Sequence, residues 1–293
     1  MRKEEFESRI GSFLLEEKLN EKAEKTLEHY EHVVKMFVDS LGAREVTKEN
    51  IMLFKSELME KYKPKTITNY ITIVNKFIKY VEILESNGEY DLDDLKKHKS
   101  KMTLKNIKVQ QKASLEEVLE PEEFKRMLRV AKKNDEMNIY LIMKIIAYTG
   151  IRIEELKKFT VEALKTNYIE VNNKGKIRNI ILRQDLRKEL IEYCKNNGIK
   201  EGYIFRGKKE GCMMHQTTIW NHMKKVAGMC RGIKKSKVHA HSFRHLFAIK
   251  FMSEGGDIGE LADILGHASV DTTRIYTRTT DYMKRKRLEK MKY

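Results

Sequence analysis

Apolar residues recur every three or four positions through the first third of the chain, which is the pattern of helices that each bury one face. Between residues 24 and 41 this apolar stripe consists of Leu27, Tyr30, Val34, Phe37 and Leu41. A first helix is predicted over residues 4–18, and Gly42 suits the stop after the second, because glycine readily adopts the left-handed conformation that ends many helices. Thr47 can cap the start of a third helix.

The fourth predicted helix begins at Pro64, because proline in a first turn loses no hydrogen bond. Its apolar stripe consists of Ile67, Ile71, Val74, Ile78 and Val81. A polar stripe with the same spacing consists of Lys65, Asn69, Thr72, Lys76 and Lys79. The two stripes lie about 200° apart around the helix axis, so one face packs while the other offers hydrogen-bond donors to phosphates or base edges. An ordinary solvated lysine face is the alternative interpretation.

Periodicity weakens between residues 87 and 118, where the chain is charged and has no sustained apolar stripe. This composition predicts a basic linker with one short helix near residues 91–97. Such a linker can follow a nucleic-acid backbone or serve only as a flexible connection. The sequence therefore predicts two domains, over residues 1–86 and 119–293, on either side of the linker.

The second half combines helical patterns with one pair of short β-type runs. An apolar helix is predicted over Met137–Tyr148. The runs 168–171 and 177–182 flank Asn-Asn-Lys-Gly-Lys, which predicts a β-hairpin with Gly175 at its turn. Further helices are predicted over residues 184–197, 215–230, 241–255, 257–265 and 281–291. The expected fold is thus mostly α, with a small antiparallel sheet in the second, mainly helical domain.

Charge narrows the class of binding partner. Lys and Arg number 59 against 43 Asp and Glu, which gives a formal net charge of +16. A protein this basic usually binds a polyanion, and nucleic acid is the commonest one. A ribosomal or merely basic housekeeping protein is the alternative. No apolar run approaches the roughly 20 residues that span a bilayer, and the N-terminus has no signal-peptide pattern, so a cytoplasmic protein with no membrane partner is expected.

The cysteines do not change this picture. Cys194, Cys212 and Cys230 are odd in number and indicate no disulfide framework. A zinc site would have to combine Cys212 and Cys230 with His215 and His222, but this spacing fits no common zinc module. Free core or surface cysteines are the better interpretation, and we expect no metal and no other cofactor.

One candidate for chemistry is the segment His-Ala-His-Ser-Phe-Arg-His, residues 239–245. On a helix that begins near His241, the side chains of His241, Arg244 and His245 share one face. Arginine offers a planar fork for two phosphate oxygens, and histidine exchanges a proton near neutral pH, so the cluster suits phosphate chemistry. The alternatives are a metal site that uses His239 and His241, or a histidine-rich surface turn.

A second candidate is the segment Leu-Gly-His-Ala-Ser-Val-Asp-Thr-Thr-Arg-Ile-Tyr, residues 265–276. Gly266 is predicted to end one helix, His267 to lie in the turn, and Ser269 to cap the next helix. Tyr276 lies nine positions after His267. A lone tyrosine is usually a packing residue and the chain has 13 of them, so this segment alone is a weak indication.

A third candidate is the segment Thr-Gly-Ile-Arg-Ile-Glu-Glu-Leu, residues 149–156. After the break at Gly150, Arg152 stands at a helix start. Glu155 follows one turn later, where its carboxylate can orient the guanidinium.

Together, the three segments resemble the tyrosine recombinase (phage integrase) family in order, spacing and flanking residues. The family's pattern is an Arg after a Thr-Gly turn, a hairpin Lys, a His-x-x-Arg, a Leu-Gly-His and a Tyr nine residues later. The matching residues here are Arg152, Lys174, His241, Arg244, His267 and Tyr276. Lys174, directly before Gly175, matches the hairpin lysine best, and Lys176 is the alternative. The first half resembles the family more loosely, as a four-helix core-binding (SAM-like) domain.

The resemblance implies a mechanism. Arg152 and Arg244 would clamp one DNA phosphate and stabilise the charge of the transition state, without a metal ion. Tyr276 would attack phosphorus and form a 3′-phosphotyrosyl bond, which keeps the strand ready for rejoining without ATP. The hairpin lysine would protonate the leaving 5′-oxygen, and His241 would accept the tyrosine proton or bind a phosphate oxygen. His267 would hydrogen-bond the phosphate.

The resemblance also implies partners. These are double-stranded recombination sites, further copies of the chain in a tetramer that exchanges strands through a Holliday junction, and accessory DNA-bending or directionality proteins. The predicted basic helix over residues 281–291 would either dock on a neighbouring subunit or form a solvated end.

The biological role stays open between two uses of the same reaction. Integration or excision of a mobile element or phage is the favoured role, and a Xer-like resolvase of chromosome or plasmid dimers is the alternative. A non-catalytic DNA-binding regulator is the alternative from a different class, and the intact set of six residues argues against it. A type IB topoisomerase uses similar chemistry, but its usual extra domains are absent from this sequence.

Overall fold

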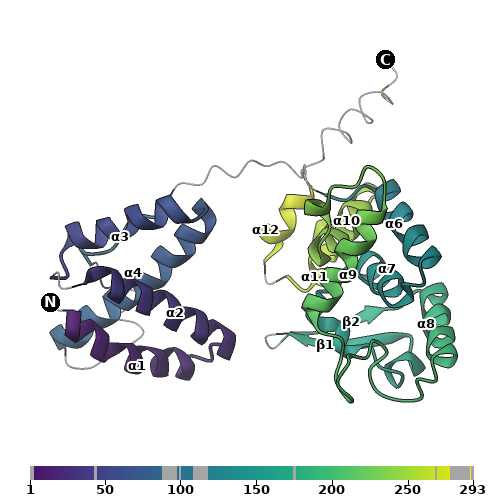
Figure 1. Cartoon of the computed structure of the whole chain (residues 1–293), viewed down its shortest axis with the longest axis horizontal. Coiled ribbons are helices and arrows are strands. Elements are labelled where there is room, and N and C mark those ends of the chain that lie inside the picture. Colours follow the sequence, from purple (N-terminus) through teal and green to yellow (C-terminus); the bar gives the residue numbers. More distant parts are fainter. Residues whose placement is uncertain are drawn as a thin grey trace. The chain divides into compact units, whose positions relative to one another are not determined.

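The computed structural model describes residues 3–42, 45–87, 98, 100–107, 118–173, 176–267, 269–277 and 291. The chain forms two compact units, Met1–Gln111 and Lys112–Tyr293 (Figure 1). Each unit has an apolar core of its own. The predicted short helix at 91–97 lies outside the described residues, as does the predicted helix at 281–291 apart from Met291. Among the residues described, no helix is both long and apolar enough to cross a membrane.

The first unit is built from the helices α1 (Lys3–Leu19), α2 (Glu24–Leu41), α3 (Lys48–Lys61) and α4 (Pro64–Asn87). Four fully buried aromatic side chains meet in its core: Phe6, Phe13, Phe37 and Phe77. Phe6 packs edge-on against Phe37 and Phe77, with ring centroids 6.3 and 5.6 Å apart. These rings join α1, α2 and α4, and Phe54 of α3 packs against Phe37, so the four predicted helices are confirmed as one packed unit.

The predicted helix ends of the first unit are also confirmed. Gly42 follows α2 with a φ of 57°, in the left-handed region that glycine adopts without strain. The side chain of Thr47 accepts a hydrogen bond from the backbone N–H of Asn50 and so caps α3. Pro64 is the first residue of α4.

Residues 100–107, which the sequence places in a linker, pack against the first unit. The side-chain amide of Asn75 on α4 donates to the carbonyl of Leu104 at 2.8 Å and accepts from its N–H at 2.7 Å. Leu104 is buried against the first core. The apolar residues of this segment, Met102, Leu104 and Ile107, follow no regular helical or strand spacing, which is why the sequence did not place it with the first unit.

The second unit is mainly helical, with one hairpin. Its α-helices are α6 (Pro121–Lys133), α7 (Met137–Thr149), α8 (Gln184–Asn196), α9 (Gln216–Met229), α10 (Ala240–Ser253), α11 (Ile258–Leu265) and α12 (Val270–Thr273). Short 3₁₀ helices span Ile153–Lys158, Ala163–Lys165, Lys235–Lys237 and Arg274–Tyr276. The strands β1 (Tyr168–Asn173) and β2 (Lys176–Ile181) form an antiparallel pair in which Tyr168 faces Ile181. The predicted fold class is confirmed.

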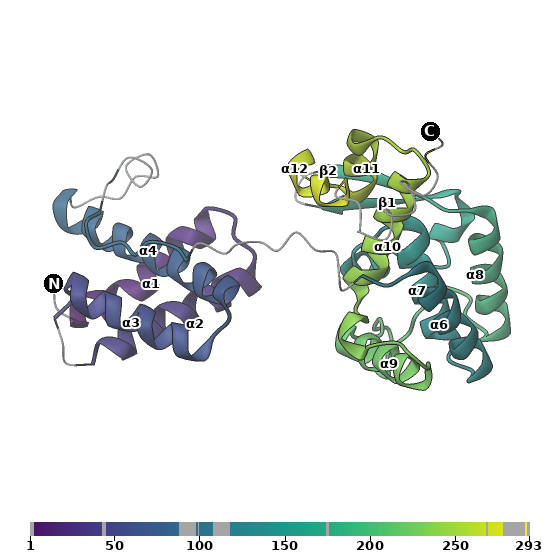
Figure 2. The same cartoon turned by 90° about the horizontal axis from the view of Figure 1, so that it is seen from above.

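Helix α7 lies at the centre of the second unit and contacts α6, α8, α9 and α10 (Figure 2). Gly150 ends it with a φ of 65°. A β-carbon on Gly150 would lie 2.6 Å from the Phe247 ring of α10 and 2.8 Å from the Leu265 side chain of α11. Only glycine allows these three elements to approach so closely, and their meeting point is where the candidate catalytic residues gather.

Candidate active site

Glu155 is the buried carboxylate of the site, at 5% exposure in the 3₁₀ helix that follows Gly150. It accepts the backbone N–H of Arg152 at 2.7 Å, while its contact with the Arg152 guanidinium is long, at 3.5 Å. Its strong partner is Arg178 of β2, whose two terminal nitrogens donate at 2.9 and 2.8 Å. Burial raises the pKa of Glu155, but the hydrogen bonds and charges of Arg178 and Arg152 outweigh it, so the pKa lies below its usual value.

Arg178 is a site residue that the sequence analysis missed. It lies opposite Val171 in the hairpin, and opposite residues share one face of a sheet, so Arg178 belongs to the inward face with the buried Val171 and Ile180. An arginine at an inward position of an otherwise apolar strand needs a buried partner. That alternation was the available signal, and the partner is Glu155, 23 residues earlier in the chain.

Arg244 is buried on α10, at 4% exposure, and its guanidinium is held by the protein itself. It donates to the carbonyl of Gly150 at 2.5 Å and to the carbonyl of Leu265 at 2.7 Å. The second of these nitrogens also contacts His267 Nε2 at 3.0 Å. Burial first, and then the charge of Arg152, lower the pKa of Arg244 to about 10, which still leaves it charged at neutral pH.

Arg152 is the more open of the two predicted clamping arginines, with 29% of its side chain exposed. It donates to the carbonyl of Gly266 at 3.1 Å. A β-carbon on Gly266 would lie 2.5 Å from Arg178 Nη1, so Arg178 presses against the same turn. The turn 265–267 is thus surrounded by three guanidiniums, of which that of Arg152 is the best placed to meet a phosphate from solvent.

His267 has a defined tautomer. Its Nε2 contacts Arg244, which can only donate, so Nε2 is the acceptor and the ring hydrogen lies on Nδ1. Nδ1 then donates to Thr273 Oγ1 at 2.8 Å. Burial, followed by the charges of Arg244 and Arg152, lowers the pKa of His267 to about 4, so the ring is neutral at neutral pH. Thr273, fully buried on α12, is a second positioning residue that the sequence analysis missed.

Tyr276 lies in the 3₁₀ helix after α12 and is buried, at 6% exposure. Its hydroxyl is 2.7 Å from Nδ1 of His245 on α10. Burial raises the pKa of Tyr276 above its usual 10, and the nearby charge of Arg244 opposes this rise. The candidate nucleophile and the arginine cluster therefore meet within one chain. Figure 2 shows α11 and α12 beside the hairpin at one end of the second unit, and α10 contacts α11.

The two histidines that the sequence placed on one helix face differ in exposure and in their partners. His241 lies exposed in the first turn of α10, and its ring centroid is 6.4 Å from that of His245. The tyrosine hydroxyl bonds to His245, whereas the sequence analysis expected His241 beside it. Lys174 lies outside the described residues, and Lys176 is the first residue of β2. His239 caps α10 by accepting the N–H of Ser242.

The polar stripe of α4 is only partly available to a ligand. Lys65, Asn69 and Thr72 are exposed, and Lys79 is half-buried. Lys76 instead forms an ion pair at 2.6 Å with Glu17 of α1, whose side chain is fully buried. The sequence could not show this partner, which lies 59 residues away, and a phosphate would have to compete with Glu17 for the Lys76 ammonium.

Three of the four residues considered for a zinc site bind another group, and the fourth, Cys212, is an exposed free cysteine. His215 caps α9 by accepting the N–H of Thr217, and His222 lies 2.9 Å from Glu136. The thiol of Cys230 contacts the carbonyl of Val226. In the part of the chain that the structure describes, no group of three or more His, Cys, Asp or Glu residues could hold a metal ion.

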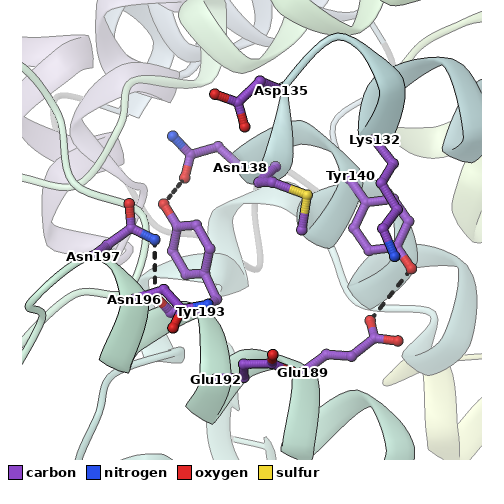
Figure 3. Close-up of a pocket in the computed structure, with 10 residues that line it drawn as sticks. Lys132, Asp135, Asn138, Tyr140, Glu189, Glu192, Tyr193, Asn196 and Asn197 are labelled. Carbon is purple, nitrogen blue, oxygen red and sulfur yellow. Dashed lines mark hydrogen bonds between the residues drawn. The ribbon is translucent and has the colours of Figure 1, made fainter.

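A separate cavity of about 630 Å³ lies beside α6, α7 and α8 (Figure 3). Its polar lining includes Tyr193, hydrogen-bonded to Asn138, and Tyr140, 3.5 Å from Glu189. None of the catalytic residues placed above lines it.

Comparison with known proteins agrees with this arrangement. The profile of the phage integrase family matches residues 117–283. The tyrosine recombinase XerA of Pyrococcus furiosus is 28% identical over 288 residues, which cover 94% of this chain and 92% of the relative. The structure of the XerH recombinase bound to its difH substrate after cleavage has a TM-score of 0.73 at 20% identity, and covers 97% of this chain and 84% of that chain. The structure of the Tn1549 transposon integrase with circular intermediate DNA has a TM-score of 0.68 at 16% identity, and covers 99% of both chains.

At these identities the two structures establish the likeness of fold, while the family profile spans more than half of the chain. The segments Thr-Gly-Ile-Arg, His-Ser-Phe-Arg and Leu-Gly-His to Tyr276 all lie within the matched residues. The chain belongs to the phage integrase family and is a tyrosine-type site-specific DNA recombinase.

Proposed function

We propose that Tyr276 cleaves DNA by attacking a phosphodiester held between Arg152 and Arg244. The observation that carries this proposal is that buried Tyr276 packs in one cluster with Leu265, the first residue of the arginine-surrounded turn 265–267, inside a single chain. Attack on phosphorus forms a 3′-phosphotyrosyl bond and releases a 5′-hydroxyl. Because the bond energy is retained in the phosphotyrosyl link, the reverse attack rejoins a strand without ATP.

Two arginines supply the electrostatic part of the reaction. A phosphodiester resists attack because its anionic oxygens repel the nucleophile, and paired guanidiniums offset the charge that grows in the transition state. Arg152 offers its exposed donors, while Arg244 is fixed by two backbone carbonyls and has little freedom to move. We assign His241, exposed beside them, to a phosphate oxygen. His267 also donates a hydrogen bond to the phosphate once its Nε2 carries a proton.

The leaving 5′-oxygen needs a proton, and the hairpin lysine is the proposed acid. Lys174 is the first choice and Lys176 the second. Strand β2 is tied to the site because Arg178 binds Glu155, which in turn holds the backbone of Arg152. This link joins strand β2 of the hairpin to the phosphate-binding arginines.

The first unit is the proposed core-binding domain, and the second is the proposed catalytic domain. Lys65, Asn69, Thr72 and Lys79 form the face of α4 that would contact the DNA backbone. Two sites and four strand ends require four copies of the chain, so the active form is proposed to be a cytoplasmic tetramer on DNA that exchanges strands through a Holliday junction. Accessory DNA-bending or directionality proteins belong to the same proposal.

Integration or excision of a mobile element is one role that this reaction serves. A Xer-like role in resolving dimers is the second candidate, favoured by a specific observation: the relatives from Pyrococcus furiosus and Pyrococcus horikoshii, both named XerA, cover 94% and 98% of this chain. The likeness of fold extends to both the XerH and the Tn1549 complexes and therefore does not separate the two roles.

Covalent capture tests the proposed reaction. The full chain would be incubated with a pool of nicked duplexes of randomised sequence, and protein–DNA complexes that survive boiling in detergent would be sequenced. The wild-type chain should enrich one palindromic site, and Tyr276→Phe should bind that site without forming a covalent complex. Attachment should persist in EDTA. Covalent complexes with Tyr276→Phe, or attachment that requires added Mg²⁺, would contradict the proposal.

A further inference from the structure

The buried hydroxyl of Tyr276 lies within hydrogen-bond distance of His245, 2.7 Å from its Nδ1. We propose that His245 is a catalytic residue, which holds the tyrosine hydroxyl in place and accepts its proton as the oxygen attacks phosphorus. This inference rests on the proposed function, because it names the base for the same nucleophile. It assigns to His245 the proton transfer that the sequence pattern suggests for His241.

Burial explains why a protein group has to take this proton. Tyr276 is 6% exposed and packs with Ala248, Leu261 and Leu265 in one apolar cluster. Bulk water therefore has little access to the phenolic oxygen, and the proton leaves through a neighbouring side chain. The ring of His245 lies beside the tyrosine ring, with the centroids 5.5 Å apart.

The position of His245 is fixed by the helix that carries it. Helix α10 is anchored by Phe243, which is fully buried in the main core of the second unit. It is also anchored by Arg244, whose two terminal guanidinium nitrogens each donate to a backbone carbonyl. His245 follows these two residues directly, so its backbone has no freedom to shift away from Tyr276. A positioned base of this kind needs no rearrangement at the moment of reaction.

The charges around His245 keep it in the form that can accept a proton. Burial first, and then the neighbouring His241, His239 and Arg244, lower its pKa to about 4, so the imidazole is neutral at neutral pH. Burial raises the pKa of Tyr276, so the phenol keeps its proton while no DNA is bound. A phosphate bound at Arg152 and Arg244 would add negative charge beside the pair, which favours the imidazolium form of His245. Proton transfer is then coupled to substrate binding.

Cleavage moves two protons, one at the tyrosine oxygen and one at the 5′-oxygen. The Tyr276 oxygen forms its bond to phosphorus while its proton passes to His245 Nδ1. The bond from phosphorus to the 5′-oxygen breaks, and that oxygen takes its proton from the hairpin lysine. In rejoining, the 5′-hydroxyl gives its proton to the hairpin lysine as it attacks phosphorus, the tyrosine oxygen leaves, and His245 returns its proton to that oxygen. The ring hydrogen of neutral His245 must therefore lie on Nε2.

Nitrogen-15 NMR on histidine-labelled full chain tests that tautomer without any reaction. The spectrum of His245 should show the Nε2–H form with Nδ1 as an acceptor, and the Nδ1 signal should shift in Tyr276→Phe, which removes the hydrogen bond. An Nδ1–H form would make His245 the donor to the tyrosine oxygen and would overturn the proposal.

Kinetics on DNA provide the second test. The substrate is a duplex with a sulfur atom at the 5′ position of the scissile bond, because a thiolate leaves without an acid and so isolates the tyrosine side of the reaction. His245→Gln should lower the single-turnover rate of attachment about 10²-fold or more, the usual contribution of a general base. It should also flatten the acidic limb of the pH–rate profile. His241→Gln should lower the rate at every pH and leave that limb in place.

Two controls keep the outcomes distinct. DNA affinity and the urea midpoint of His245→Gln and His245→Asn, measured alongside, show whether each variant is folded and binds its site. A folded His245 variant that attaches at the wild-type rate, with its acidic limb intact, overturns the inference alone. Absence of attachment by the wild-type chain would instead refute the proposed function.

Discussion

At the scale of single residues, the site is held together by hydrogen bonds from arginines to backbone carbonyls. Arg244 binds the carbonyls of Gly150 and Leu265, and Arg152 binds that of Gly266. A lysine at either position would place one point charge where the guanidinium serves two or more acceptors. The same turn carries His267, whose tautomer is set between Arg244 and Thr273, so the positions of these side chains depend on one another.

The histidines of the site make its stability sensitive to acid. The pKa of both His245 and His267 is about 4 in the folded chain, and near 6.5 when a histidine is unfolded. Between these values the unfolded chain binds more protons than the folded chain. The free energy of unfolding should therefore fall as the pH is lowered, by up to about 1.4 kcal/mol per pH unit for each histidine. This stability is fully present above pH 6.5 and lost toward pH 4.

Urea denaturation of the second unit in the full chain, at several pH values between about 4.5 and 6.5, measures this slope. Glu155, whose pKa is also lowered, adds to the slope at the acidic end of this window, and it does so in the wild-type chain and in both variants. His267→Gln should reduce the slope by the share of one histidine. His32→Gln, which removes an exposed histidine from the first unit, should leave it unchanged. Equal slopes in His267→Gln and the wild-type chain would show that His267 is not held neutral.

At the scale of elements, the periodic part of the structure was predictable and the pairing between elements was not. The stripes of α2 and α4, the caps at Thr47 and Ser269 and the glycine stops at Gly150 and Gly266 depend on nearby residues, and the structure confirms them. These signals lie within a few positions of the feature they predict, so a single sequence contains them.

The choice between His241 and His245 shows where prediction from sequence ends. The two residues are four positions apart, so helical periodicity places both on the same face. Only the path of the chain from α11 to Tyr276 decides which ring meets the hydroxyl. The same holds for the pairs Arg178–Glu155 and Lys76–Glu17, because each joins segments that no local pattern connects.

The pair formed by Glu155 and Arg178 should be the strongest polar link between the hairpin and the rest of the site. Glu155→Gln removes the charge opposite Arg178, whose side chain is 11% exposed, and should destabilise the second unit by about 3–5 kcal/mol, as expected when one partner of a buried ion pair is lost. Glu154→Gln, at the exposed neighbouring position, is the matched control and should change stability little. Urea denaturation measures both.

A double-mutant cycle separates this link from the other contacts of Glu155. Arg178→Met combined with Glu155→Gln should cost less than the sum of the two single changes, because the second change no longer leaves a buried charge unpaired. Additive free energies of unfolding would show that the two side chains are not coupled, and that the hairpin is positioned by its apolar contacts instead.

At the scale of the whole molecule, the excess of positive charge serves DNA binding only where the cations are free. The formal net charge is +16, yet Lys76 on the polar stripe of α4 is neutralised by the buried Glu17. Lys65 lies on the same helix and is exposed. A free lysine that contacts a phosphate releases bound counterions, whereas a lysine already paired with a carboxylate releases fewer.

The salt dependence of binding to the captured DNA site distinguishes these two lysines. Lys65→Gln should make the plot of log affinity against log salt concentration shallower by about 0.9, the value for one phosphate contact. Lys76→Gln should leave the slope nearly unchanged but lower the free energy of unfolding of the first unit, because Glu17 stays buried without its partner. Fluorescence anisotropy and urea denaturation of the full chain measure the two effects. If Lys76→Gln flattens the salt dependence as much as Lys65→Gln and leaves stability intact, then Lys76 releases Glu17 when DNA binds. The whole polar stripe of α4, as the sequence pattern first indicated, would then form the DNA-contacting face.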